Sequence, residues 1–210
     1  MSNNKYIQYG CGWASPVPES WRNFDASPTL RYERLPLIGK LYTKNHARFP
    51  ENVEYGDIVK GLPVQMGTCK GVYCSHVLEH LSLEDFRKAL QNTYRILRSG
   101  GIFRLVLPDL EYSIKKYIND PADDAAHTFM KETSLGQEKR NRGLKGVAFS
   151  LLGNSQHLWM WDFKAIESEL RNAGFIEIRR ARFGDSMDHF FTEVEERGRW
   201  ENCLGVECLK

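Results

Sequence analysis

The feature that most constrains this chain is a short strand-like run that leads into two glycines. Residues 5–9 are β-prone and partly apolar, and Gly10-Cys11-Gly12 follows them directly. Glycine is favoured where φ must be positive or where a ligand approaches the backbone closely. The stretch therefore predicts a first strand and a tight turn that has little room for Cβ atoms.

A carboxylate follows the next predicted strand. Residues 21–25, Trp-Arg-Asn-Phe-Asp, indicate a second strand with Asp25 at its carboxyl end. A glycine turn followed by an acid after the next strand can hold an adenosine, because the carboxylate accepts both ribose hydroxyls while the turn contacts the rest of the ligand. Taken alone, these residues fit a tight turn beside a surface acid equally well.

Composition limits the classes of protein to which the chain can belong. Its 210 residues, 41% of them hydrophobic, predict one domain, 1–210, with a full core. The net charge of +2 gives no reason to expect a nucleic-acid partner, and no apolar run approaches the roughly 20 residues of a membrane span. The five cysteines stand singly, and the polar first residues are no signal peptide. We expect a cytoplasmic protein without disulfides, a metal site or a membrane partner.

The order of predicted elements favours an α/β fold. Five strands joined by longer, partly helical crossovers predict a parallel sheet with helices on both faces. Two further strands are expected near the end of the chain. Strands are expected at residues 5–9, 21–25, 52–55, 71–75, 102–107, 176–181 and 204–209, and helices at 82–98, 111–118 and 163–172.

Candidate site residues gather at one edge of this predicted sheet. In parallel sheets, ligands bind outside the carboxyl ends of the strands. The residues expected there are Gly10, Gly12, Asp25, Asp57, Ser75, His76 and Asp109.

Residues 119–160 form the least regular part of the chain. The segment is too long for an ordinary connection, so we expect a cap-like insertion. One hypothesis is a mobile cap that closes over an acceptor site, and the other is a permanently packed helical insertion. A helical turn is also considered at residues 37–42.

Several motifs together resemble a known family. The chain is similar to the class I S-adenosylmethionine-dependent methyltransferases of the small, single-domain bacterial kind, type 11-like. The motifs that carry the resemblance are Tyr9-Gly10-Cys11-Gly12, Asn23-Phe24-Asp25, residues 73–81, residues 97–102 with Leu107-Pro108-Asp109, and residues 170–175.

The resemblance implies a Rossmann-like, seven-stranded, mostly parallel sheet whose last strand is antiparallel. It also implies S-adenosylmethionine as cofactor. Because Pro16 and Pro18 lie in the short gap before the second strand, the first helix is expected to be short or missing. Expected cofactor contacts are Tyr9, Gly10 and Gly12 at the turn, Asp25 at the ribose, Asp57 and Ile58 at the adenine, and Ser75 and His76 near the methionine part.

Histidines are the candidates for chemistry, because their pKa suits proton removal near neutral pH. We expect His157 to face the acceptor as a base, with His76 as a pocket wall or second base. For either one, a hydrogen-bonded structural histidine is an equally good interpretation.

Candidate acceptor contacts each have a plainer alternative. Asp109 either orients a hydroxyl or caps a helix, and Trp159 either stacks on a ring or anchors the insertion. Arg140 and Arg142 either bind an anionic group or form a solvated face.

The expected activity is methyl transfer to a small-molecule acceptor, preferably a hydroxyl of a sugar or other metabolite, by a monomer or homodimer. The alternative is a non-catalytic module that retains the fold. It is motivated by the missing third glycine of the turn and the short first crossover.

Overall fold

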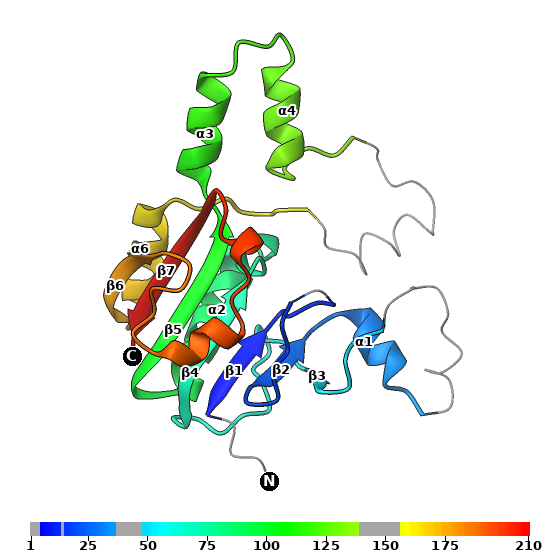
Figure 1. Cartoon of the computed structure of the whole chain (residues 1–210), viewed down its shortest axis with the longest axis vertical. Coiled ribbons are helices and arrows are strands. Elements are labelled where there is room, and N and C mark those ends of the chain that lie inside the picture. The colour runs from blue at the N-terminus through cyan, green and yellow to red at the C-terminus, as the bar shows by residue number, and fades with distance from the viewer. Residues whose placement is uncertain (1–4, 14, 37–47, 139–155) are drawn as a thin grey trace.

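Seven strands form one sheet in the computed structural model, which describes residues 5–13, 15–36, 48–138 and 156–210 (Figure 1). Their order is β3-β2-β1-β4-β5-β7-β6, and β7 runs antiparallel to both β5 and β6. The strands are β1 (Tyr6–Tyr9), β2 (Arg22–Asp25), β3 (Val53–Tyr55), β4 (Cys69–Ser75), β5 (Leu97–Pro108), β6 (Ile176–Ala181) and β7 (Cys203–Leu209). The predicted Rossmann-like, mostly parallel α/β fold with an antiparallel last strand is confirmed.

The helices occupy the crossovers between strands. They are α1 (Pro28–Glu33), α2 (Leu83–Ile96), α3 (Leu110–Ile118), α4 (Ala125–Glu132) and α6 (Phe163–Asn172), with 3-10 turns η2 (Leu78–His80), η3 (His189–Glu193) and η4 (Arg197–Arg199). Side chains cap two of these helices: Ser82 Oγ accepts from the N–H of Asp85 at 3.2 Å, and Asp162 Oδ1 accepts from the N–H of Ala165 at 2.8 Å. Between β1 and β2 the described residues contain turns but no helix, so the first helix is missing as expected.

The core has two halves because side chains alternate across the strands. On one face, Phe103 and Leu105 pack with the apolar residues of α2 and α6. On the other face, Val106 packs with Phe191 and Trp200, which come from the segment between β6 and β7. Helices therefore cover one side, and 3-10 turns and loops cover much of the other (Figure 1).

One predicted boundary is wrong. The helix expected to end at Ser99-Gly100-Gly101 ends at Ile96, and β5 begins at Leu97. Leu97 is fully buried and pairs with Cys69 of β4, so burial favours the strand over a further helical turn. Gly100, with φ +68°, lies within the strand instead of ending the helix.

Part of the predicted insertion is described. Its helix α4 packs against α3, and the two form a hairpin beyond the carboxyl end of β5 (Figure 1). Residues 139–155 lie outside the described residues, as does the helical turn considered at 37–42. The cap function of 119–160 therefore stays a prediction. No helix in the described ranges is long and apolar enough to cross a membrane.

Candidate functional site

The glycine turn lies at the carboxyl end of β1 and has two different constraints. Gly10 donates its N–H to Phe24 O at 2.8 Å, and a Cβ there would lie 2.2 Å from Cγ2 of Val77. Gly12 has φ +59°, and a Cβ there would meet no atom of the described residues within 4 Å. Packing against Val77 therefore excludes a side chain at Gly10. At Gly12 the space beside the backbone is open, so a ligand can approach it.

Asp25 ties this turn to β2. Its Oδ2 accepts from the N–H of Gly12 at 2.9 Å, and its Oδ1 accepts from the N–H of Ser27 at 2.7 Å. The residue is only 8% exposed, so the carboxylate is held in place. An ionised carboxylate offers about four lone-pair sites, which leaves capacity for further donors such as ribose hydroxyls.

Two glycine variants distinguish the effect of a strained turn on stability from the effect of a blocked backbone on cofactor binding. Gly12→Ala and Gly67→Ala both place a side chain at positive φ in open space, so each is expected to lower stability by about 1–2 kcal/mol. Gly67 precedes the amino end of β4, whereas Gly12 follows the carboxyl end of β1. Only Gly12→Ala is expected to weaken S-adenosylmethionine binding, by at least about tenfold in calorimetry. Equal affinity in the two variants would contradict a ligand at the turn.

The turn after β3 lies beside Asp25, since Gly56 donates its N–H to Asp25 O at 3.1 Å. Asp57 Oδ1 accepts from the N–H of Val59 at 3.0 Å and so shapes this turn. Ile58 is 5% exposed and belongs to the core. Tyr9 also points into the core, where its hydroxyl lies 3.3 Å from Thr93 Oγ1, so its contribution to the turn is its backbone.

Ser75 and His76, at the carboxyl end of β4, are held by Arg199 of η4. Arg199 Nε donates to Ser75 Oγ at 2.9 Å, and its Nη2 donates to Ser75 O at 2.6 Å. His76 Nε2 lies 2.9 Å from Arg199 O. Three contacts therefore lock the end of β4 to a segment far away in the sequence.

His76 is held as an imidazolium, since both of its ring nitrogens face acceptors. Nε2 faces Arg199 O, and Nδ1 lies 3.4 Å from Glu79 Oε1. Burial lowers the pKa of His76, but interactions with Cys203, Glu79 and the Arg199 carbonyl outweigh it and raise the pKa to about 10. With a φ of +54°, the residue also has a constrained backbone. This arrangement suits a positioning residue better than a base.

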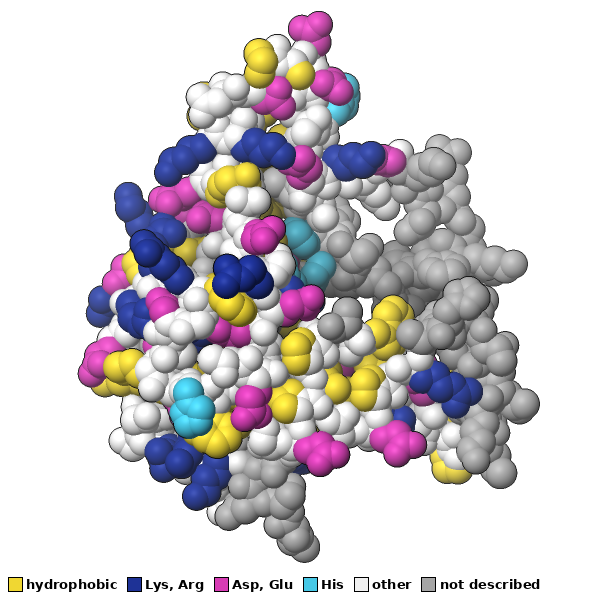
Figure 2. Space-filling model, in the orientation of Figure 1, with side chains coloured by type: hydrophobic (Ala, Val, Ile, Leu, Met, Phe, Trp, Pro, Cys, Tyr) yellow, Lys and Arg dark blue, Asp and Glu magenta, His cyan; other side chains and the backbone are white. Residues whose placement is uncertain are grey.

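A third group of side chains surrounds the buried Glu79 of η2. His80 Nε2 and His157 Nε2 each lie 4.0 Å from Glu79 Oε1. Backbone contacts bring His157 there: Leu158 and Trp159 both donate their N–H groups to Glu79 O, at 2.8 and 3.1 Å. Burial lowers the pKa of His157. Figure 2 shows histidine side chains reaching the surface below the α3–α4 hairpin.

This edge of the sheet lies within a range that matches a known family. Residues 8–105 match the family described as a methyltransferase domain, a range that runs from β1 through most of β5. Over this range the chain is similar to a methyltransferase domain. The methyl donor of this family is S-adenosylmethionine. No curated protein matches the chain.

Several solved structures share the fold of this chain. A SAM-dependent methyltransferase of Thermotoga maritima has a TM-score of 0.51 and 14% identity, over 98% of this chain and 81% of that one. One from Archaeoglobus fulgidus has the same TM-score and identity, over 98% and 85%. PigF, solved with SAH, also has a TM-score of 0.51 and 14% identity, over 98% and 50%. At these identities the likeness shows the fold alone.

The remaining predicted site residues are those expected to contact the acceptor. Asp109 caps α3, because its Oδ1 accepts from the N–H of Glu111 at 2.8 Å. Helix capping is the plainer of the two roles considered for Asp109, the other being to orient a hydroxyl. Trp159 is 41% exposed and contacts the buried Trp161, with ring centroids 5.9 Å apart. Arg140 and Arg142 lie outside the described residues.

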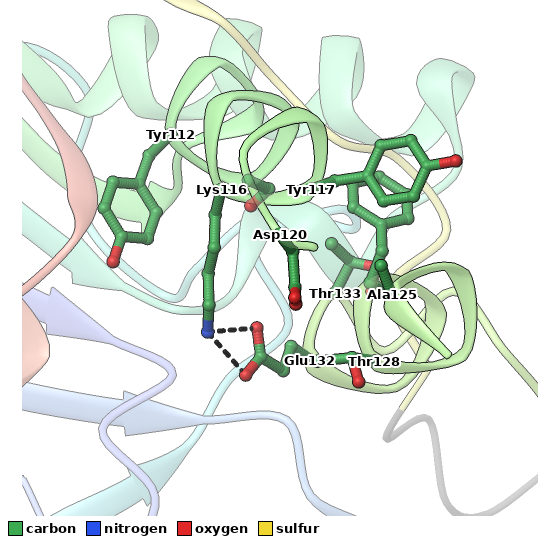
Figure 3. Close-up of a pocket in the computed structure, with 10 residues that line it drawn as sticks. Tyr112, Lys116, Tyr117, Asp120, Ala125, Thr128, Glu132 and Thr133 are labelled. Atoms are coloured by element: carbon green, nitrogen blue, oxygen red, sulfur yellow. Dashed lines mark hydrogen bonds and ion pairs between the residues drawn. The ribbon is translucent and has the colours of Figure 1, made fainter. Parts of the chain in front are cut away.

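A small pocket between α3 and α4 is separate from this site. Figure 3 shows it lined by Tyr117 and Thr128, with the ion pair between Lys116 and Glu132 across it. Lys116 Nζ lies 2.6 Å from both carboxylate oxygens of Glu132. Because it contains neither the glycine turn nor Asp25, we do not place the cofactor there.

Sequence reasoning missed Arg199, Cys203 and Glu79. Arg199 and Cys203 approach His76 only because η4 and β7 pack there, and no local sequence pattern indicates these contacts. Glu79 had a local signal, since it lies between His76 and His80 in a run that follows a buried strand. A glutamate that packs into an apolar turn between two histidines is a candidate for a functional carboxylate.

Proposed function

We propose that the chain transfers the methyl group of S-adenosylmethionine to a hydroxyl of a small molecule, such as a sugar or another metabolite. The observation that carries the cofactor side is the pairing of Gly12 and Asp25. Their 2.9 Å hydrogen bond joins an open turn to a buried carboxylate at the carboxyl edge of the sheet. That edge is where ligands bind in open α/β sheets.

The acceptor side of the proposal is the region around Glu79. His76, His157 and the exposed ring of Trp159 all come from segments that meet at η2, directly after β4. Methyl transfer depends strongly on holding the acceptor in line with the donor, and a partly exposed group of side chains next to Ser75 suits that task. Of the two expected histidines, we assign His157 to the acceptor, because both ring nitrogens of His76 already face acceptors.

Methyl transfer is tested with labelled cofactor. The purified chain is incubated with S-adenosylmethionine carrying a labelled methyl group and with the small-molecule fraction of a cell extract. Label is expected in a small-molecule product, and Asp25→Ala is expected to abolish its formation. Cofactor binding without transfer to any fraction would favour the non-catalytic module. No binding at millimolar cofactor would contradict the proposed methyl transfer.

A further inference from the structure

We propose that Glu79, His80 and His157 form a binding site for one divalent transition-metal ion, with zinc as the representative ion. One carboxylate oxygen and two imidazole nitrogens lie within 4.8 Å of one another. Imidazole ligands favour zinc and its first-row neighbours over magnesium and calcium, which prefer oxygen-only sites. No metal site is expected from the sequence, and the proposed ligand set is not visible in the residue spacing, because His157 comes from a distant segment.

The strongest argument is the state of the Glu79 carboxylate. The residue is fully buried, and none of the described residues forms a hydrogen bond with either carboxylate oxygen. His76 Nδ1 lies 3.4 Å from Oε1, which gives that oxygen a charged neighbour without a hydrogen bond. A buried carboxylate costs free energy unless it is paired or coordinates a metal. His76 supplies one positive charge beside Oε1, and the two oxygens keep lone pairs that a metal ion can use.

His80 is oriented as a ligand. His80 Nδ1 lies 3.1 Å from the carbonyl oxygen of Gln156. Since a carbonyl only accepts, the proton belongs on Nδ1, and Nε2 carries its lone pair toward Glu79. A metal-binding histidine commonly donates its other N–H to a carbonyl in this way. The rings of His80 and His157 meet at 69°, with centroids 4.9 Å apart, so both imidazoles border the same space.

The spacing is compatible with an ion after a small adjustment. Ligand atoms of a tetrahedral zinc, with bonds of about 2.0–2.2 Å, lie roughly 3.3 Å apart. The 4.0 Å separations from Glu79 Oε1 exceed this by less than about an ångström, and no two of the three ligand atoms are more than 4.8 Å apart. The side chains of His80 and His157 are 26% and 12% exposed, so small rotations about their side-chain bonds can close the gap.

Three protein ligands leave one position of a tetrahedral ion open, which is the pattern of catalytic zinc sites. A hydroxyl bound at that position loses its proton more readily, because the ion stabilises the oxyanion. In the proposed methyl transfer, the ion would thus promote the proton loss for which His157 was considered as a base. This last role rests on the proposed function, whereas the metal site itself does not.

The test is direct metal binding by the full chain, without cofactor or acceptor. The purified, metal-stripped protein is titrated with Zn²⁺ against a chromophoric chelator, and in parallel with Co²⁺ while its visible absorption is recorded. One equivalent is expected to bind. His80→Gln and His157→Gln are each expected to weaken binding at least tenfold and to lose the cobalt spectrum, whereas His127→Gln, an exposed histidine of α4, should behave as the parent.

Zinc affinity is also measured for Glu79→Gln if circular dichroism shows that this variant folds. If it does not fold, the two histidine variants decide the test. Failure of the parent chain to bind one equivalent would overturn the site. So would unchanged affinity in both histidine variants, which would mean that zinc binds elsewhere and that His76 alone balances Glu79. Because no methyl transfer is measured, loss of the proposed activity and loss of the metal site are separate results.

Discussion

Replacing Asp25 by alanine is expected to weaken S-adenosylmethionine binding by at least about tenfold while the chain stays folded. Hydrogen bonds to a charged group contribute about 1.5–3 kcal/mol each, and the two ribose hydroxyls would lose such a partner. The structure adds a second cause. The carboxylate also accepts from the N–H groups of Gly12 and Ser27, so its removal loosens the turn that the cofactor contacts.

Calorimetric titration with the cofactor measures this effect, and circular dichroism checks the fold. Asp25→Asn keeps the shape but not the charge, and we expect it to fall between the parent and Asp25→Ala. Glu54→Ala is a matched control, because Glu54 lies on the adjacent β3 with a half-exposed side chain paired to Arg22. An unchanged dissociation constant in Asp25→Ala would show that the cofactor does not bind at the end of β2.

Arg104→Ala is expected to destabilise the fold by about 3–5 kcal/mol, because it leaves the buried carboxylate of Glu195 without its cation. Arg104 is fully buried in β5. It donates to Glu195, to Glu207 Oε2 at 2.9 Å and to Asp185 Oδ1 at 3.0 Å, and its guanidinium lies 4.5 Å from the ring centre of Trp200. Burial raises the pKa of Glu195, which shows the cost of holding this carboxylate inside.

Urea unfolding measures the loss, with Arg87→Ala as the control. Arg87 pairs with Glu169 at the surface, with its side chain 54% exposed, and such pairs contribute about 0–1 kcal/mol. Equal effects of the two variants would contradict a buried network that stabilises the fold. The network also has a functional consequence, since it holds the segment that carries Arg199 against Ser75 and His76.

The sequence alone determined the features that depend on neighbouring residues. The strand before Gly10 follows from a β-prone run that ends in a glycine turn, and Asp25 follows from the same reasoning one strand later. Helix starts at Ser82 and Asp162 were predictable because an N-cap bonds to a backbone N–H only three residues ahead. The missing first helix follows from Pro16 and Pro18 in a short crossover.

Only the tertiary structure decided which distant groups meet. Leu97 joins a strand instead of a helix because its burial against β4 outweighs local propensity. Ser75 meets Arg199, and Glu79 meets His157, through packing between segments that have no local pattern in common. Local hydrogen bonds and side-chain periodicity can therefore be predicted from a short stretch of sequence. The burial of a charge and the partner that balances it depend on the packing of the whole chain.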